Sequence, residues 1–393
     1  MAGNHEVDIG IVGAGIAGAA LASALADRGL RIALVDRNDG PLDTARGDNI
    51  QPALLPVLRQ WGVLDALIEA GAEWRQGTRW FDCQQQPIVT VPASTQDDLP
   101  PGFLFLNHEH IGRVLLNRAR EGGARYLPGV AHWTLGQDGR GWSLAMRRDG
   151  NEEMLRCTLL VGADGAASRV RSQLNIPLER HNYRYPIAIL FGKECNPNSP
   201  RTLDVHLTQD RIVSLIPRTG GLSKVAFPID PSELSQWRDQ PGPVLAEQLQ
   251  RWCPTLEFES LEFGAIYPPV SQHAPPYDGR GLAVLIGDAC HAMHPARSMG
   301  MNTCFRVADQ LATLFQGVKT GFSAADITPV IKRFNRQSQQ DLKPMLAENH
   351  GAGLQMDTLS GAGFKVLTEQ LRAASQDDAI LRAMARKASG WSA

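Results

Sequence analysis

The first 35 residues combine two β-rich runs with an alanine-rich stretch between them. Residues 7–12 and 31–35 are short and rich in Val, Ile and Leu, a composition that predicts strands. Residues 17–27 are rich in alanine and leucine, which favours a helix. A strand, a helix and a strand at this spacing predict the βαβ unit of a parallel sheet.

The following segments predict further helices and a hairpin. Residues 54–70 carry apolar side chains at three- and four-residue spacings, which predicts a helix, and residues 111–120 show the same pattern. Residues 78–91 predict a hairpin with three glutamines near its turn. Residues 94–102 contain Asp-Asp-Leu-Pro-Pro-Gly and predict a loop.

The second half of the chain changes character twice. Residues 142–146 and 155–161 alternate like strands, with a turn at 148–151. Residues 177–275 consist of short β-like runs interrupted by proline and glycine, and residues 282–286 form one more apolar strand. The rest has the periodicity of helices.

These elements predict an α/β protein with a Rossmann-like domain, an inserted sheet and C-terminal helices. The expected division is a discontinuous nucleotide-binding domain (1–75, 98–176 and 276–322), a β-rich substrate domain (76–97 and 177–275) and a C-terminal helical region (323–393).

The composition argues against several classes of function. The 393 residues include 39 Lys and Arg against 41 Asp and Glu, a formal charge of −2, so no basic excess favours nucleic acid or an anionic membrane. The six cysteines are scattered without a CxxC pair, which is typical of reduced thiols in a cytosol. The apolar run at 9–26 is better explained as strand, glycine turn and helix than as a signal peptide or membrane span. We therefore expect a cytoplasmic protein without a membrane span.

A glycine motif lies between the first strand and helix. Gly13, Gly15 and Gly18 fit GxGxxG, with Ala17 inside the motif. The three glycines allow a tight turn, close approach of a pyrophosphate and close packing of the helix, whose N-terminus attracts phosphate. Asp36 follows the second strand, where an acid binds a ribose hydroxyl. The motif predicts dinucleotide binding and leaves FAD and NAD open.

Two later motifs resemble those of a known family. Residues 161–171 (VGADGAASRVR) resemble the DG motif, and residues 286–295 (IGDACHAMHP) the GD motif, of single-component FAD-dependent aromatic monooxygenases. The chain thus resembles the para-hydroxybenzoate-hydroxylase-like family, which uses FAD as resident cofactor and NAD(P)H as transient co-substrate.

The resemblance assigns roles to individual residues. Gly287 and Asp288 would bind FAD, with the Asp288 carboxylate on a ribityl hydroxyl. Asp164 and Arg171 would support the FAD and pyridine-nucleotide sites, and Arg46 would lie near the cofactor phosphates. The alternatives are a helix N-cap for Asp288, a surface turn with an ion pair for Asp164 and Arg171, and a solvated loop for Arg46.

The segment after the GD motif would contact the flavin ring. In the family, a glycine-rich turn that begins at the position of Pro295 opens a helix against the ring. The N–H groups of Met301 and Asn302 would face the flavin N1–C2=O edge, where a helix N-terminus stabilises negative charge. Gly300 would leave room for the ring.

Four positions depart from the family pattern. Ser298 and Met299 replace Gly-Gln, Val307 replaces an acid in the following helix, and His108 stands where an arginine usually opens the helix at 111–120. These departures put the usual flavin mobility and coupling in question. They also make Arg297 a candidate for binding an anionic substrate, with an ordinary surface arginine as the alternative.

The β-rich segment supplies the remaining substrate-pocket candidates. His206 and Tyr183 are singled out with Arg297, although packing is an alternative role for each; His181, Arg184, Tyr185 and Tyr267 belong to the same set. The sequence identifies no catalytic acid or base. Cys290, His291 and His294 lack the further ligands that a metal site needs, so no metal is expected.

The resemblance implies a monooxygenase that consumes NAD(P)H and O2. It would hydroxylate an aromatic or polycyclic small molecule through a flavin C4a-hydroperoxide, as a monomer or homodimer. A flavin-dependent reductase or epoxidase of a non-aromatic substrate is one alternative. A non-catalytic FAD-binding accessory protein is the other, because of Ser298, Met299 and Val307.

Overall fold

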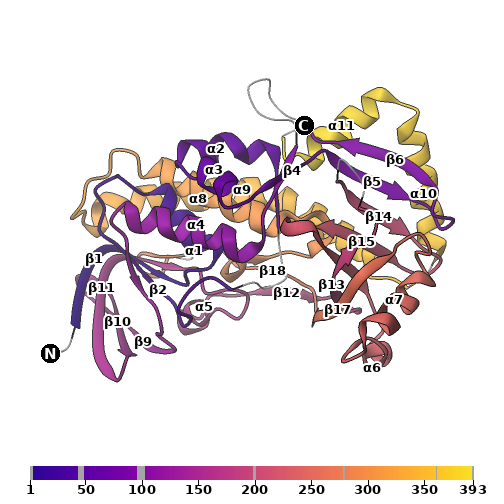
Figure 1. Ribbon diagram of the computed structural model, residues 1–393. Helices are drawn as coiled ribbons and strands as arrows, with labels where there is room; N and C mark the ends of the chain where they lie inside the picture. Colours follow the sequence, from indigo (N-terminus) through magenta and orange to yellow (C-terminus); the bar gives the residue numbers. More distant parts are fainter. Residues whose placement is uncertain are drawn as a thin grey trace.

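Two large sheets dominate the molecule, with helices packed on each (Figure 1). The computed structural model describes residues 3–42, 48–94, 102–197, 201–277, 279–359 and 361–391. The first sheet lies to the left in Figure 1 and the second to the right, with the long helix α9 (Ala324–Met356) running behind.

Seven strands of the described chain form the first sheet. In order they are β8 (Arg125–Leu127), β2 (Ile32–Val35), β1 (Gly3–Val12), β11 (Asn151–Gly162), β10 (Gly141–Arg148) and β9 (His132–Asp138), with β19 (Ala283–Leu285) paired to β11. The pairs among β8, β2, β1, β11 and β19 are parallel, whereas β9, β10 and β11 form an antiparallel meander. The predicted βαβ unit and Rossmann-like sheet are confirmed.

Helices bury one face of this sheet. α1 (Ile16–Ala24) is buried along its whole length between α4 (His108–Glu121) and α8 (Met299–Leu314). Its alanines and Gly18 allow this close packing because they leave little side chain between the backbones. The largest hydrophobic core of the described residues lies here.

The predicted helix at 54–70 is instead two short helices. They are α2 (Leu55–Gln60) and α3 (Leu64–Glu69), preceded by the short 3-10 helix η1 (Pro52–Leu54). Gly62 separates them with a φ of +72°, a conformation that glycine adopts without strain and that ends a helix. The apolar periodicity continues across the break, so the pattern alone does not reveal it.

The second sheet comes from segments 77–92 and 187–267, which fall inside the predicted substrate domain. Its described strands, in order, are β17 (Phe258–Tyr267), β13 (Ile187–Glu194), β16 (Leu222–Pro228), β15 (Ile212–Pro217), β14 (Leu203–Leu207), β5 (Gly77–Phe81) and β6 (Pro87–Pro92). The pairs are antiparallel except for β14 with β5. The hairpin predicted at 78–91 is present as β5 and β6.

This sheet has two different faces. We call outer the face on which Leu190, Val213 and Phe227 pack beneath α6 (Leu234–Trp237) and α7 (Gly242–Gln250). The opposite, inner face is covered at the β14, β5 and β6 end by α10 (Gly361–Ser375) and α11 (Asp378–Ala388).

Shorter elements join the two sheets. One small sheet contains β12 (Glu179–Asn182), β18 (Val270–His273) and β20 (His291–Ala292), and another contains β3 (Asn49–Ile50), β7 (Phe103–Phe105) and β4 (Glu73–Arg75). The remaining short helices are α5 (Arg169–Gln173), η2 (Thr219–Gly221), η3 (Pro231–Glu233), η4 (Gly287–Ala289) and η5 (Pro295–Arg297). None of the helices that the structure describes combines the length and apolar character needed to cross a bilayer.

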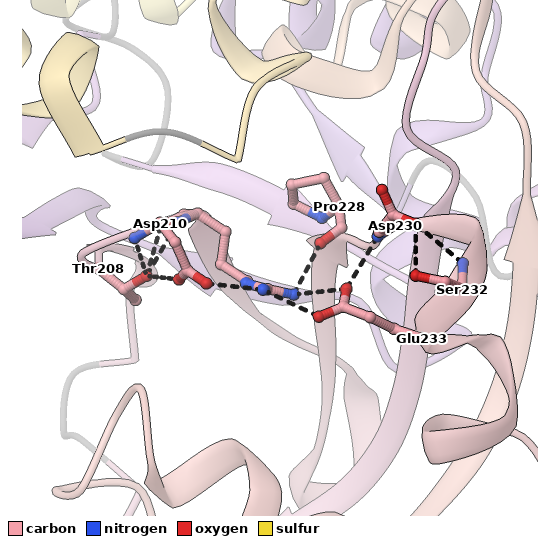
Figure 2. A network of polar contacts seen from close by, with 7 residues as sticks. Thr208, Asp210, Pro228, Asp230, Ser232 and Glu233 are labelled. Atoms are coloured by element: carbon pink, nitrogen blue, oxygen red, sulfur yellow. Dashed lines mark hydrogen bonds and ion pairs between the residues drawn. The ribbon is translucent and has the colours of Figure 1, made fainter.

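Arg211 connects the β14–β15 turn with the segment that follows β16. Figure 2 shows this polar network, in which Asp210 belongs to the turn and Glu233 to the later segment. Its guanidinium donates to both carboxylate oxygens of Glu233, at 3.1 and 3.2 Å, and to Asp210 at 2.7 Å. It also lies over the Trp252 ring, 3.9 Å from the centroid. This polar cluster joins two turns on the outer side of the second sheet.

We expect Arg211→Met to lower the free energy of unfolding by about 2 kcal/mol, because it removes charged hydrogen bonds from the buried Arg211 to Glu233 and Asp210, whose side chains are 23% and 41% exposed. Arg251→Met is the control, since Arg251 pairs with Glu247 where both side chains are about 70% exposed, and it should cost roughly 0.5 kcal/mol or less. Urea unfolding measures both values. Equal effects of the two variants would contradict the assigned role of Arg211.

Candidate functional site

The glycine motif occupies the turn between β1 and α1. Gly13 has a φ of +105°, and a Cβ there would lie 2.3 Å from the Ala163 carbonyl oxygen. A Cβ on Gly18 would lie 2.0 Å from the Gly13 oxygen, whereas a Cβ on Gly15 would meet nothing among the described residues within 4 Å. Gly13 and Gly18 are therefore needed for packing, and Gly15 leaves exposed backbone that a phosphate can approach.

Asp36 lies directly after β2, beside this turn. Its carboxylate accepts hydrogen bonds from the backbone N–H of Ala14 at 2.7 Å and of Asn38 at 2.8 Å. Each oxygen keeps a second lone pair with which to accept a bond from a ribose hydroxyl. Asp36 thus both fixes the glycine turn and borders the place where a nucleotide would bind.

The DG motif forms a turn that leads into α5. Asp164 accepts hydrogen bonds from the Ser168 hydroxyl at 2.5 Å and from the backbone N–H of Arg169 at 2.7 Å and Val170 at 3.1 Å. The Ser168 oxygen in turn accepts from the Arg171 N–H and caps the helix. Asp164 is thus a structural acceptor within the motif.

Two side chains join the DG and GD motifs. The buried Arg171 guanidinium donates to the carbonyl oxygens of Ala166 at 2.9 Å and Ala289 at 2.8 Å. Gln272 of β18 donates to the carbonyl oxygens of Ala166 at 3.0 Å and Asp288 at 2.8 Å. Two motifs more than 100 residues apart are thereby held in one assembly.

We expect Arg171→Met to destabilise the protein by about 3 kcal/mol, because two carbonyl groups lose a buried, charged donor. FAD affinity should fall with it, since the two motifs lose their connection. Thermal unfolding and FAD titration measure the two effects. Arg156→Met, which removes a half-exposed pair with Asp138, is the control and should change neither.

The GD motif contacts the glycine turn directly. Gly287 has a φ of +58°, and a Cβ there would lie 2.5 Å from the Ala17 Cβ. Asp288 follows in η4 and is half-buried. Ile286, not Asp288, occupies the N-cap of η4, so the alternative role as a helix cap is not observed.

The turn before α8 keeps the backbone shape that glycine would favour. Ser298, at the position of the family's glycine, has a φ of +51° and precedes the helix. The helix begins at Met299, so the N–H groups of Met299, Gly300 and Met301 have no acceptor within it. This is one residue earlier than the sequence suggests, because Asn302 falls inside the first helical turn. A Cβ on Gly300 would meet no atom of the described part of the chain within 4 Å, so space lies open at this helix end.

The Asn302 side chain fixes this helix end. Its Oδ1 accepts from the Gln51 N–H at 2.9 Å, and its Nδ2 donates to the Asn49 oxygen at 2.9 Å and the Ser298 oxygen at 2.8 Å. These three bonds use both amide protons and determine the orientation of the amide. Asn302 therefore has a structural role next to the open space.

The other departures from the family pattern have clear positions. Val307 is buried in the core between α8 and its neighbours, where an acid would need a partner. His108 is the first residue of α4, and its N–H donates to the Asp48 carboxylate at 3.2 Å. Arg46 lies outside the described residues.

Tyr183 lies beside the turn that contains Pro295. It is buried, its hydroxyl bonds to Ser271 at 2.7 Å and to His350 at 2.8 Å, and its ring lies 4.5 Å from that of His294. Burial raises the pKa of Tyr183 and lowers that of His294 to about 4. His294 directly precedes Pro295, so Tyr183 packs against this turn through the His294 ring.

The two other substrate-pocket candidates lie elsewhere. Arg297 forms an ion pair with Glu348 of α9 at 2.5 Å, consistent with the surface alternative. His206 stacks on Phe81 and bonds to Gln85 at 2.7 Å. Its neighbours Val205 and Leu207 pack on the inner face, so alternation along the strand places His206 on the outer face. The structure does not bring His206 together with the glycine, DG and GD motifs.

Sequence reasoning missed Gln272, Gln51 and Asp48. Gln272 joins the DG and GD motifs, and Gln51 bonds to Asn302. Asp48 forms an ion pair with Lys224 of β16, with 2.8 Å between the carboxylate oxygen and Nζ. None belongs to a recognisable motif. Only Asp48, two residues after Arg46, lies next to a position that the resemblance singled out.

The family assignment follows from this geometry and from comparison with known proteins. The FAD-binding domain family matches residues 6–327. The chain belongs to this family. The resemblance to single-component FAD-dependent aromatic monooxygenases is thus confirmed, and FAD is the cofactor that the assembled motifs fit: an open glycine turn, an acid beside that turn and open space at the start of α8.

Named relatives of this FAD-binding protein are hydroxylases and monooxygenases. It is 24% identical over 351 residues to 3-demethoxyubiquinol 3-hydroxylase of Escherichia coli (strain K12), covering 86% of this chain and 87% of the relative. It is 27% identical over 327 residues to 6-methylpretetramide 4-monooxygenase of Streptomyces rimosus, covering 81% of this chain but only 57% of the relative. The fold matches p-nitrophenol 4-monooxygenase PnpA of Pseudomonas putida DLL-E4 over the whole of both chains, with a TM-score of 0.82 and 18% identity.

We expect Asp288→Ala to weaken FAD binding about tenfold, because a carboxylate that accepts a bond from a hydroxyl contributes about this much. Asp65→Ala, at an exposed position in α3, is the control and should bind FAD like the wild type. Quenching of flavin fluorescence measures both affinities. Wild-type affinity in Asp288→Ala would contradict the role assigned to Asp288.

Proposed function

We propose that the protein is an FAD-dependent monooxygenase that consumes NAD(P)H and O2 and hydroxylates an aromatic or polycyclic small molecule. The observation that carries this proposal is the assembly of the DG and GD motifs by Arg171 and Gln272, next to the glycine turn and the open N-terminus of α8. The names of the relatives support the reaction class.

Different residues would bind different parts of FAD. The turn shaped by Gly13 and Gly18 would let the pyrophosphate approach the backbone at Gly15, Asp36 would bind the adenosine ribose, and Asp288 would accept a bond from the ribityl chain. When bound, FAD accepts hydride from NAD(P)H and activates O2. The protein binds and orients the cofactor and excludes water from the reacting atoms.

The N-terminus of α8 would stabilise negative charge on the reduced flavin. The unpartnered N–H groups of Met299, Gly300 and Met301 carry partial positive charge at the open space above α8. They would stabilise negative charge on the flavin N1–C2=O edge in the reduced state without any side-chain movement.

The inner face of the second sheet would hold the substrate. Phe191, Ser214, Ile216 and Ala226 are paired on adjacent strands and remain partly exposed on that face. Lys224, which pairs directly with Phe191 and Ile216 and so shares their face, bonds to Asp48 just before β3. The partly exposed strip therefore faces the FAD-binding part, and its apolar and aromatic side chains suit a flat, apolar substrate.

Labelled oxygen distinguishes this reaction from its alternatives. The FAD-loaded protein is incubated with NADPH or NADH, 18O2 and a panel of phenols, polycyclic aromatics and non-aromatic alkenes, and products are analysed by mass spectrometry. One label atom in a hydroxylated product supports the proposal. Reduced product without label indicates a reductase, and label in a non-aromatic epoxide indicates an epoxidase. The absence of NAD(P)H oxidation with every compound indicates an accessory protein, and each of these results contradicts the proposal.

A further inference from the structure

Residues 388–391 return to the FAD-binding part after α11 has packed on the second sheet. We call these residues the clasp. The carbonyl oxygen of Ala388 accepts from the Gln51 side chain at 3.2 Å, that of Ser389 accepts from the Ala53 N–H at 3.0 Å, and that of Gly390 accepts from Arg306 of α8 at 2.5 Å. Three successive carbonyl groups are thus bound by the segment after β3 and by α8.

The same segment also binds the chain that follows β6. The Ser389 hydroxyl, which is fully buried, accepts from the Ser94 N–H at 2.6 Å. The Trp391 indole N–H donates to the Ser94 carbonyl oxygen at 2.7 Å. The clasp therefore connects the second sheet, through Ser94, with the residues that flank the flavin site.

Gln51 links the clasp to the N-terminus of α8. Its side chain contacts the clasp, and its backbone N–H bonds to Asn302, whose amide also holds Asn49 and the Ser298 carbonyl. Both Gln51 and Asn302 are buried. The position of the α8 N-terminus is thus determined in part by residues nearly 90 positions further along the chain.

Gly390 is required at its position for two reasons. Its φ is +83°, and a Cβ there would lie 2.5 Å from the Gln51 Oε1 and 2.6 Å from the Arg306 Nη2. Any side chain at Gly390 would therefore displace Gln51 and Arg306, the two residues whose side chains bind the clasp.

We propose that Gln51 and the clasp are positioning residues for FAD. They hold Asn302, and through it the α8 N-terminus, at the distance from which its free N–H groups bind the flavin pyrimidine edge. This inference rests on the proposed function, which places that edge above α8. The clasp bonds to Gln51, and Gln51 bonds to Asn302, so the clasp acts on FAD through these two residues.

The test compares Gly390→Val with Gly363→Val, a glycine in α10 whose Cβ would meet nothing within 4 Å. FAD affinity is measured by fluorescence quenching, and the midpoint potential of bound flavin by dye equilibration. We expect Gly390→Val to weaken FAD binding about tenfold and to make the potential more negative, because the helix end moves away from the reduced flavin. Gly363→Val should change neither.

Other outcomes separate this proposal from the proposed function. A Gly390→Val protein that melts at a lower temperature but keeps wild-type affinity and potential shows a merely structural role and overturns the clasp proposal alone. If Gly390→Val does not fold, Trp391→Phe removes only the bond to Ser94 and should weaken FAD binding about threefold; wild-type binding would overturn the proposal. Failure of the wild type itself to bind FAD overturns the proposed function, and the clasp proposal with it.

Discussion

Gly15→Val is expected to weaken FAD binding about 100-fold while leaving the apoprotein folded. Gly15 has a φ of −67° and a ψ of −173°, outside the left-handed region that favours glycine, and a Cβ there would meet no atom of the described residues within 4 Å. The valine side chain would instead fill the space through which the pyrophosphate approaches the backbone. The loss is therefore specific to the cofactor.

Gly351→Val provides the matched control, because Gly351 also has open space around its Cβ but lies in α9. Circular dichroism should show both variants folded, and fluorescence titration should show wild-type FAD affinity only in the control. A Gly15→Val protein with unchanged affinity would exclude the glycine turn as the phosphate site.

Acidification from pH 7 to pH 5 is expected to lower the free energy of unfolding by roughly 5 kcal/mol. His206, His291 and His294 are buried, and burial lowers the pKa of each to about 4. In the unfolded chain their pKa returns to about 6.5, so the unfolded state binds more protons below that pH. The contribution of these histidines to the free energy of unfolding is therefore present above pH 6.5 and is lost as the pH falls towards 4. The loss is about 2 kcal/mol per histidine at pH 5.

Urea unfolding at constant excess FAD, repeated between pH 7 and 5, measures this dependence. His206→Gln should reduce the loss at pH 5 by about 2 kcal/mol, because the contribution of one buried histidine is removed. His132→Gln, at an exposed position in β9, is the control and should leave it unchanged. A stability that does not change between pH 7 and 5 would contradict the neutral, buried state of these histidines.

The sequence predicts those parts of the fold that depend on neighbouring residues. The βαβ unit, the hairpin at 78–91 and the turn at 148–151 arise from local patterns, and each is present. The break at Gly62 is missed because one glycine with positive φ outweighs an uninterrupted apolar periodicity.

The candidate site is predictable only where a motif marks it. The glycine, DG and GD motifs come together as the resemblance implies, but the bonds between them involve Arg171 with Ala289 and Gln272 with Ala166, partners 118 and 106 residues apart. His206 could not be assigned to a face of its sheet without the strand register. The clasp lies far from every motif, and no local pattern marks it.

The most direct test of FAD binding is the visible spectrum of the purified protein after incubation with FAD and removal of unbound cofactor, followed anaerobically with NADPH and then with oxygen. We expect bound flavin absorption that bleaches with NADPH and returns with oxygen. A folded protein that remains colourless, even with FAD in excess, would contradict the assignment of the glycine turn, Asp288 and the α8 N-terminus to one FAD site.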